Sequence, residues 1–242
     1  MLPPSSMSQS LPQSLPQLLP QLLDQSRHPS LRLVLASNNA KKLSELQSLL
    51  VGLPLVIVAQ GSLGIAEAEE PHHSFIENAL AKARHAARAC GSAAVADDSG
   101  LCLAALGGAP GVISAHFAGN LEPMAGEDRE ALRRRQDAAN NAALLDKLQG
   151  VVDRRGHFIS TLVAIRHADD PEPLVAVGRW PGEILQAPRG DQGFGYDPLM
   201  FIPDLGATVA ELGAEQKNQH SHRARSAALL RAMLVDAWHL GR

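Results

Sequence analysis

The chain has 242 residues, of which 45% are hydrophobic and 19% charged, and its formal net charge is −3. A chain of this length can bury the core of one sizeable domain, or of two lobes around a shared sheet. The weak negative charge argues against a nucleic-acid surface, which usually needs a basic patch, and no apolar run is long enough to span a membrane. Cys90 and Cys102 lie among alanines and leucines without metal-ligand spacing, which favours reduced core thiols in a cytoplasmic protein.

Residues 1–30 differ in composition from the rest of the chain. Leu-Pro-Gln units recur there, and prolines at this spacing prevent a stable helix. A basic start followed by an uninterrupted apolar run, which is typical of a secretory signal, is missing. We predict a disordered Leu/Pro/Gln-rich extension over residues 1–30 and a folded domain over residues 31–242.

Strands and helices are predicted to alternate at first, and a run of strands follows. Buried strands are expected at 31–36, 55–59 and 93–96, and longer strands at 157–166 and 174–177. Helices are expected at 40–50, after the S-x-x-E capping box of Ser74 and Glu77 to about 90, at 128–148, and from Ser221 to about 240. This order predicts an α/β fold with a mixed sheet.

The segment Ser37–Lys42 joins the first strand to the first helix. A helix start presents unpaired N–H groups and a partial positive charge, so a phosphate group binds there readily. Ser37 and Asn39 add side-chain donors, and Lys42 adds a positive charge. Taken alone, however, these residues are better explained as an ordinary helix cap beside a solvated lysine pair.

Two groups of acidic residues are candidate metal ligands. Asp97 and Asp98 follow the strand at 93–96, and ligands of open α/β sheets gather beyond the carboxyl ends of strands. Adjacent carboxylates are costly to hold close together without a cation or donors, and Mg²⁺ favours one or two carboxylates together with phosphate oxygens. An exposed turn is the alternative, but the clean strand before it favours the metal. In the acidic loop before Lys82, capping already explains Glu77 and solvation explains Glu67.

The segment Gly193–Pro198 places Phe194 and Tyr196 between glycines. Aromatic residues in such a loop are poor core material and good stacking platforms, although a turn that buries Phe194 is the alternative. Downstream, His222 and Arg223 begin the last helix. A basic first turn opposes the helix dipole, so it requires a compensating reason.

Several common nucleotide and metal motifs are missing. The sequence contains neither G-x-x-x-x-G-K-[ST] nor G-x-G-x-x-G, so a P-loop or a classical dinucleotide fold has no support. It also lacks the H-E-x-x-H zinc signature.

In their order, the motifs S-N-N-A-K-K, F-I-E-N-A-L-A-K-A, D-D-S-G-L, G-G-A-P-G-V-I-S-A, G-F-G-Y-D-P and S-H-R resemble those of the Ham1/RdgB family of inosine/xanthosine triphosphate pyrophosphatases. The resemblance runs from about Leu33 to Leu234. It implies an elongated central mixed sheet flanked by helices, with two lobes and an active-site cleft between them. It also implies homodimers, dependence on Mg²⁺, and a role in clearing deaminated purine nucleotides.

The resemblance assigns residue roles. Asp98 matches the essential aspartate and would hold Mg²⁺ together with Glu69 or Glu70, whose register is open. The expected substrate contacts are Ser37, Asn38, Asn39, Ala40, Lys41, Lys42, Lys82, Ser99, Phe194, Gly195, Tyr196, Asp197, Lys217, His222 and Arg223.

The sequence departs from the family pattern at two positions. Asn38 stands where the family often has glycine, so it must adopt the backbone shape that glycine would take. His116 replaces an arginine, which puts a charged role at that position in doubt.

The resulting hypothesis is hydrolysis of the non-canonical purine triphosphates ITP, dITP and XTP to the monophosphate and pyrophosphate. Water would attack the α-phosphorus, and Asp98 would accept its proton. Arg223 can only donate hydrogen bonds, so it would favour a 6-oxo purine over adenine, while Phe194 or Tyr196 would stack on the base.

Two alternatives remain open. One is a related pyrophosphatase that acts on modified pyrimidine or ordinary nucleotides. The other is a nucleotide-binding module without catalysis, against which the paired aspartates argue, because phosphate binding alone gains nothing from added negative charge.

Overall fold

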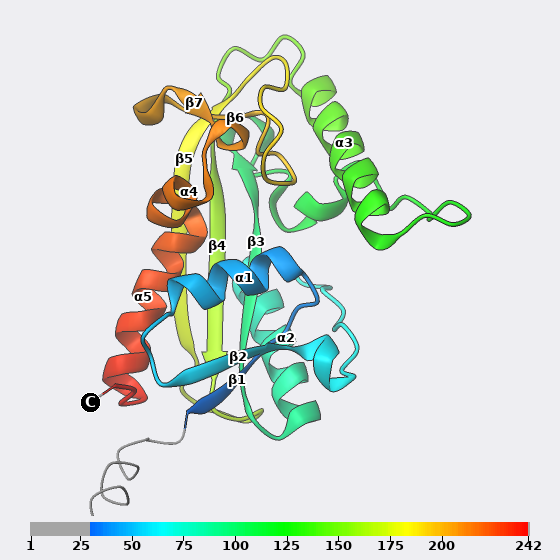
Figure 1. Cartoon of the computed structure of the whole chain (residues 1–242). Helices are drawn as coiled ribbons and strands as arrows, with labels where there is room; N and C mark the ends of the chain where they lie inside the picture. The colour runs from blue at the N-terminus through cyan, green and yellow to red at the C-terminus, as the bar shows by residue number, and fades with distance from the viewer. Residues whose placement is uncertain (1–29, 242) are drawn as a thin grey trace, which may run out of the picture. The chain divides into compact units, whose positions relative to one another are not determined.

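A seven-stranded mixed sheet organises residues 30–241, the part of the chain that this computed structural model describes (Figure 1). The strand order is β2-β1-β3-β4-β5-β6-β7, with β1 parallel to both β2 and β3 and all later pairs antiparallel. The strands are β1 (Leu31–Leu35), β2 (Leu55–Ala59), β3 (Ala93–Leu103), β4 (Arg155–Ile165), β5 (Leu174–Ile184), β6 (Met200–Ile202) and β7 (Ala207–Thr208). Because β2 and β7 are edges, the sheet is open.

Helices flank this sheet, and their starts follow the capping signals of the sequence. They are α1 (Ala40–Leu49), α2 (Phe75–Cys90), α3 (Arg129–Lys147), α4 (Ala214–His220) and α5 (His222–Ala237). The Ser74 hydroxyl accepts a bond from the backbone N–H of Glu77, so the predicted N-cap is confirmed. The Glu77 carboxylate accepts from the Ser74 hydroxyl and not from the Ser74 backbone N–H, so the reciprocal bond of a capping box is not formed. Ser221 caps α5 through the backbone N–H of Ala224, also as predicted, but the helix ends at Ala237.

The two faces of the sheet carry separate cores, because successive side chains of a strand point to opposite faces. Leu33 and Val95 belong to the core against α1 and α5. Val34, Ala94 and Ala96 belong to the core against α2, whose buried residues there are alanines. This alternation decides to which face of the sheet each later side chain of β3 points.

The third strand is longer than the sequence predicted. Its ladder with β1 ends at the pair of Leu35 and Val95, but β3 continues to Leu103 with β4 as its partner. Asp97 and Asp98 therefore lie inside a strand, so the predicted end of the strand at residue 96 was wrong, as was the alternative of an exposed turn. Asp, Ser and Gly have low strand propensity, and pairing with a distant strand overrides it. Similarly, β5 continues past the predicted end at 177, through Gly178 to Ile184.

The predicted α/β class with a mixed sheet flanked by helices is confirmed. The predicted extension over residues 1–30 lies almost wholly outside the described residues and stays a prediction. No helix in the described part of the chain is both long and apolar enough to cross a membrane.

The connection between β4 and β5 is held by one buried carboxylate. Asp170 accepts hydrogen bonds from the backbone N–H groups of Arg166, at 2.8 Å, and Glu172, at 3.0 Å, and from the side chain of Arg166. The bonds from Arg166 hold the pKa of Asp170 well below its ordinary value. The charged carboxylate therefore stabilises the folded state at neutral pH.

We predict that Asp170→Asn lowers the free energy of unfolding by about 1–3 kcal/mol at pH 7, because hydrogen bonds to a charged group are lost. Since the folded-state pKa is depressed, the difference from wild type should shrink as the pH falls below about 4, where the unfolded-state carboxyl protonates. Urea unfolding at several pH values measures this. The exposed neighbour Asp169 provides the control, and an equal effect of Asp169→Asn would contradict the prediction.

Candidate active site

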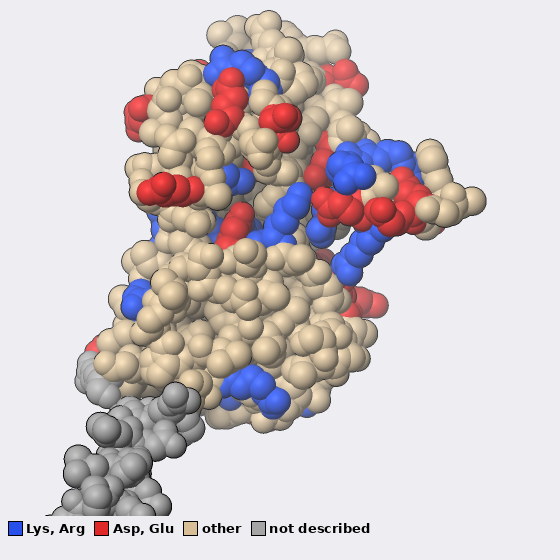
Figure 2. Space-filling view, in the orientation of Figure 1, with Lys and Arg blue, Asp and Glu red and all other residues tan. Residues whose placement is uncertain are grey.

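A cavity of about 520 Å³ opens beside β3, beyond the point where β1 ends. Its walls come from the β1–α1 turn, β3, α3, the segment after Gly193 and the start of α5. Figure 2 shows lysine and arginine side chains reaching into the hollow of the surface between α1 and α3. The volume suits a small molecule of nucleotide size.

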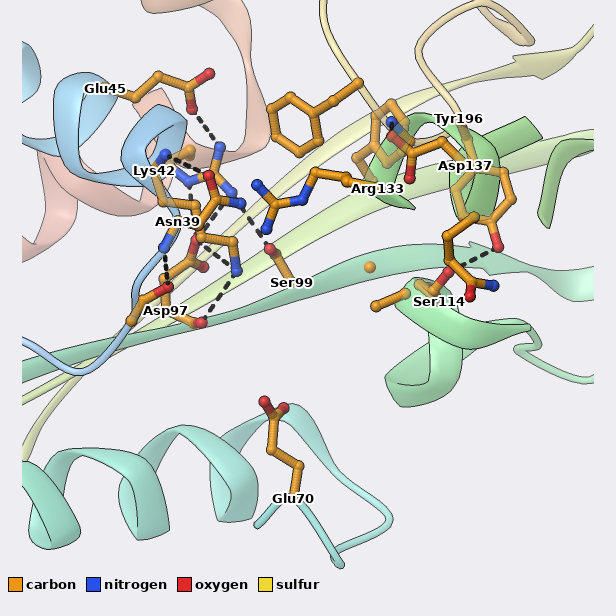
Figure 3. A pocket seen from close by; sticks show the side chains of 18 of the residues that line it. Asn39, Lys42, Glu45, Glu70, Asp97, Ser99, Ser114, Arg133, Asp137 and Tyr196 are labelled. Atoms are coloured by element: carbon orange, nitrogen blue, oxygen red, sulfur yellow. Dashed lines mark hydrogen bonds and ion pairs between the residues drawn. The ribbon is translucent and has the colours of Figure 1, made fainter. Parts of the chain in front are cut away.

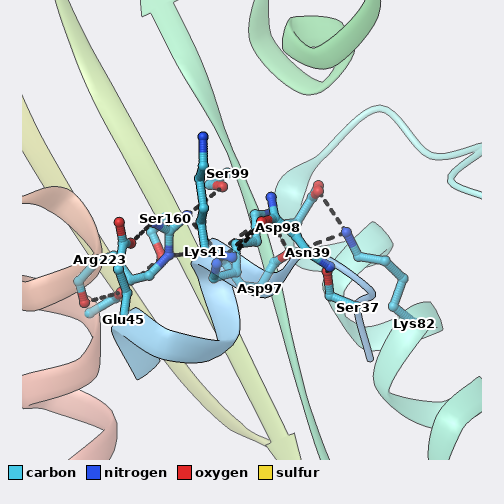
Figure 4. A network of polar contacts seen from close by, with 12 residues as sticks. Ser37, Asn39, Lys41, Glu45, Lys82, Asp97, Asp98, Ser99, Ser160 and Arg223 are labelled. Carbon is cyan, nitrogen blue, oxygen red and sulfur yellow. Dashed lines mark hydrogen bonds and ion pairs between the residues drawn. The ribbon is translucent and has the colours of Figure 1, made fainter. Parts of the chain in front are cut away.

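Asp97 is the centre of a buried charge network (Figure 4). Its carboxylate accepts bonds from Nε of Arg223 at 2.9 Å and from Oγ of Ser160 at 3.0 Å, and Nζ of Lys42 lies 3.4 Å away. Burial alone would raise the pKa of Asp97, but the guanidinium of Arg223 and the ammonium of Lys42 hold it well below its ordinary value. Groups of the protein itself therefore neutralise and hydrogen-bond the Asp97 carboxylate.

Asp98 points to the opposite face of the sheet, toward α2. Its Oδ1 accepts a bond of 2.9 Å from Nζ of Lys82, whereas its buried Oδ2 has no hydrogen-bond partner within the described residues. Burial raises the pKa of Asp98 to about 6 despite the opposing charge of Lys82. The expectation that Asp97 and Asp98 act as one carboxylate pair was wrong, because strand alternation separates them. Of the two residues, Asp98 is the one whose carboxylate has an oxygen without a hydrogen-bond partner among the described residues.

Glu70 supplies the second carboxylate beside Asp98. Its Oε2 lies 3.0 Å from Nζ of Lys82, which thus contacts both acidic groups. Burial alone would raise the pKa of Glu70, but the charge of Lys82 lowers it below its ordinary value. Both glutamates are exposed, but Glu70 lines the cavity and Glu69 does not. Of the two residues that the sequence left open, the geometry favours Glu70.

These two carboxylates fit a magnesium ion. Within the described residues, no group of three or more His, Cys, Asp or Glu side chains could hold a metal. A zinc-like or calcium-like cage is therefore missing from this part of the chain. Mg²⁺ needs only one or two carboxylates, because waters and phosphate oxygens complete its shell. The unpartnered Oδ2 of Asp98 is a buried oxygen on which a cation would relieve the cost of burial.

The β1–α1 turn is a capped helix start that faces the cavity. Oδ1 of Asn39 accepts bonds from the backbone N–H groups of Lys41, at 3.0 Å, and Lys42, at 3.3 Å. Oγ of Ser37 accepts from the N–H of Asn39 at 3.2 Å. The cap therefore uses amides that the sequence had assigned to phosphate, and the donors left for a ligand are fewer than expected.

The residues of this turn divide into two sets. Ser37, Asn39 and Lys42 line the cavity, and Asn38, Ala40 and Lys41 do not. Asn38 does not adopt the left-handed backbone expected of a glycine position, since His239 is the one non-glycine residue with positive φ in the described range. The side-chain oxygen of Asn38 is instead buried against Gly61, with no hydrogen-bond partner in the described part of the chain.

Phe194 stands between two ammonium groups at the cavity wall. Nζ of Lys41 lies 5.6 Å from the ring centroid, and Nζ of Lys217 lies 5.5 Å from it. Asp197 holds this loop by accepting bonds from the N–H of Phe194 and from Lys217. A Cβ atom at Gly193 would lie 2.0 Å from Oδ2 of Asp197, so this position requires glycine.

Tyr196 corrects the expectation that neither aromatic residue belongs to a core. It lines the cavity, but it is buried in the cluster around Leu101 and Trp180, and its hydroxyl donates to the carbonyl of Ser114 at 2.9 Å. Phe194, which is half-buried, is therefore the better stacking surface.

The start of α5 explains its basic first turn. Arg223 ion-pairs with Asp97 and Glu45 and donates to Oγ of Ser99 at 3.3 Å, which offsets the unfavourable helix dipole. His222 lines the cavity and packs its ring 5.0 Å from that of Phe158, and its Nδ1 is buried without a hydrogen-bond partner among the described residues. Burial lowers the pKa of His222 well below its ordinary value, so the imidazole is neutral.

Gly178 of β5 sets the position of this helix start. A Cβ atom there would lie 2.1 Å from the carbonyl oxygen of His222 and 2.5 Å from the backbone nitrogen of Ser226. The strand and the helix are in contact through their backbones, so no other residue fits without displacing α5.

The part of the cavity wall that α3 forms was not predicted from the sequence. Arg129, Arg133, Gln136 and Asp137 recur at helical spacing and line the cavity (Figure 3). Asp137 also accepts a 2.8 Å bond from the N–H of Gly195. Polar residues at this spacing are equally typical of a solvated helix face, so the sequence held no signal to separate the two. His116 is exposed and does not line the cavity.

The sequence model of the Ham1 family matches residues 33–233. The chain belongs to the Ham1 family. The predicted resemblance is thereby confirmed. A family relative from Methylibium petroleiphilum, named a dITP/XTP pyrophosphatase, is 67% identical over 208 residues, which cover 86% of this chain and 99% of the relative. A dITP/XTP pyrophosphatase from Burkholderia pseudomallei is 56% identical over 205 residues, covering 85% of this chain and 94% of its own.

Solved structures of Ham1 proteins share the fold. The HAM1 protein from Coxiella burnetii superposes with a TM-score of 0.76 at 39% identity, covering 85% of this chain and 99% of its own. A nucleoside-triphosphatase, named a dITP/XTP pyrophosphatase, from Mycobacterium abscessus superposes with a TM-score of 0.61 at 38% identity, covering 83% and 98% respectively.

The two adjacent aspartates should respond differently to the same substitution. Asp97→Asn leaves the buried charge of Arg223 undercompensated, so we predict a loss of about 3–5 kcal/mol in the free energy of unfolding. Asp98→Asn should leave stability close to wild type, because Lys82 keeps Glu70 as its counter-ion. Chemical denaturation of both variants measures the difference. Equal losses would show that the two carboxylates do not have separate roles.

Proposed function

We propose that the chain hydrolyses ITP, dITP and XTP to the nucleoside monophosphate and pyrophosphate, and so clears deaminated purines from the nucleotide pool. The observation that carries the proposal is the Asp98–Lys82–Glu70 cluster beside a capped helix start. Glu70 and Lys82 line the cavity, whereas Asp98 does not line it but is bonded to Lys82. Two carboxylates for a metal therefore lie beside a cationic surface for phosphate. The names of the family relatives point to the same reaction.

The metal proposed for this site is Mg²⁺, held by Asp98 and Glu70. When bound, it would neutralise charge on the phosphate oxygens and template the substrate. Lys82 already lies between the two carboxylates, at 2.9 Å from Asp98 and 3.0 Å from Glu70. It keeps them close together, and its ammonium would also stabilise the leaving pyrophosphate.

The remaining roles follow from charge and position. Asp98 would accept a proton from the water that attacks the α-phosphorus. Lys42 and the donors of Ser37 and Asn39 would bind the phosphate chain. Asp97 would take no part in proton transfer, because Arg223 and Lys42 hold it charged.

The base would stack on Phe194 and be recognised at the start of α5. Recognition of the 6-oxo group was predicted for Arg223, but its guanidinium already donates to Asp97, Glu45 and Ser99. His222 has a ring nitrogen without a partner, and a neutral imidazole carries one N–H donor. We therefore propose that His222 donates to the 6-oxo group and that Arg223 fixes its position. A homodimer and a cytoplasmic location, where the nucleotide pool is found, also belong to the proposal.

The direct test is a pyrophosphate-release assay with ITP, dITP, XTP, ATP, GTP and modified pyrimidine triphosphates. We expect turnover of the first three to depend on Mg²⁺, to vanish with a chelator and to return when Mg²⁺ is restored. Asp98→Asn should remove most of the activity while the protein stays folded. Preference for a pyrimidine or an ordinary purine would support the related pyrophosphatase instead, and binding without turnover would support a nucleotide-binding module.

Base selection should respond differently to two variants. His222→Ala should reduce the ITP-over-ATP ratio of kcat/KM by about tenfold, because an unmade hydrogen bond costs roughly 1–3 kcal/mol. Phe194→Ala should lower kcat/KM alike for ITP, GTP and ATP, since stacking is worth about 1–3 kcal/mol for any base. Steady-state kinetics with the three substrates provides the comparison. If the ratio in His222→Ala matched wild type, His222 would not read position 6.

A further inference from the structure

The cations that line the cavity are paired with carboxylates, with one exception. The ion pairs are Lys42 with Asp97, Lys82 with Asp98 and Glu70, Arg129 with Glu67, Lys217 with Asp197, and Arg223 with Asp97 and Glu45. Arg133 makes no ion pair and no hydrogen bond with any described residue. An anion that enters the cavity therefore meets one guanidinium that forms no ion pair with a described carboxylate.

The obvious partner for Arg133 is engaged elsewhere. Asp137 lies one helical turn further along α3, at the spacing where oppositely charged side chains often pair. Its Oδ2 instead accepts the backbone N–H of Gly195 at 2.8 Å, and the structure contains no ion pair between Asp137 and Arg133. The guanidinium of Arg133 is therefore left without an ion pair, whereas the carboxylate of Asp137 holds the loop at Gly195.

The helix also fixes where Arg133 points. In Figure 3 its side chain extends across the cavity toward Asn39 and Ser99, on the side of the β1–α1 turn. The first turn of α3 is tied to the opposite wall by the pair of Arg129 and Glu67, at 3.0 Å, and by the pair of Glu130 and Lys41, at 3.3 Å. Arg133 follows Arg129 by one helical turn, so these two ion pairs also hold the backbone of Arg133 in place.

We propose that Arg133 is a substrate-binding residue that contacts the phosphate groups of the nucleotide from the α3 side. This assignment rests on the proposed function for the identity of the substrate. A guanidinium binds phosphate through two parallel charge-assisted hydrogen bonds, which a neutral base edge cannot match in strength. Arg133 would complete the phosphate site from the wall opposite Lys42, so that the triphosphate lies between α1 and α3.

The test uses inorganic tripolyphosphate as the probe, because it contains the phosphate groups without the base. Titration calorimetry of the full chain in the presence of Mg²⁺ should show a Kd at least about tenfold weaker for Arg133→Ala than for wild type. Arg134→Ala is the matched control, since Arg134 is the next residue of α3, is exposed and does not line the cavity. It removes the same charge from the same helix, and its Kd should stay within about twofold of wild type. Arg133→Lys should fall between Arg133→Ala and wild type.

Activity provides the second readout. With ITP, Arg133→Ala should raise KM by about tenfold, and Arg134→Ala should not. All three variants should keep the wild-type Tm, because neither arginine forms an ion pair or a hydrogen bond with a described residue. Equal Kd values for Arg133→Ala and Arg134→Ala, or no binding of tripolyphosphate by wild type, would overturn the assignment.

Calorimetry needs no turnover, so the two proposals can fail separately. If wild type did not hydrolyse ITP but Arg133→Ala still lost tripolyphosphate affinity, the proposed function would fail and the Arg133 assignment would stand. If wild type hydrolysed ITP and Arg133→Ala bound tripolyphosphate normally, the reverse would hold.

Discussion

The buried ion pair between Asp97 and Arg223 is the interaction on which the arrangement of the site depends. It joins the middle of β3 to the first turn of α5, and Lys42 adds α1 to the same carboxylate. A buried charge without its partner is strongly destabilising, so these elements are held in one relative position. Ser99, Lys42 and His222 are placed around the cavity as a consequence.

The alternation of side chains along β3 then gives Asp97 and Asp98 different surroundings. Asp97 faces α1 and α5 and is neutralised there, whereas Asp98 faces α2 and retains an oxygen without a partner. The same backbone thus provides a permanently charged anchor and, one residue later, a carboxylate with a raised pKa. The strand needs no special loop to achieve this, since the pleat alone directs the two side chains apart.

Local features of the fold could be predicted from the sequence, and features that depend on distant contacts could not. The caps at Ser74 and Ser221 follow from a few neighbouring residues, and both were found. The contact between Lys82 and Asp98 could be predicted only by knowing that α2 packs on the face of β3 to which Asp98 points. The extension of β3 past Ala96 depends on pairing with β4, which lies more than fifty residues later in the sequence. The α3 wall was invisible for the same reason, because nothing local distinguishes Arg133 from the solvated Arg134.

The backbone contact at Gly178 limits how this site can vary. Glycine carries no functional group and does not line the cavity here, yet a single methyl group at this position would collide with the carbonyl of His222. Substitutions that change the cavity wall alone are therefore accessible at side chains such as Phe194. A library that randomised β5 would lose most of its members at Gly178, through displacement of a helix rather than through any change in chemistry.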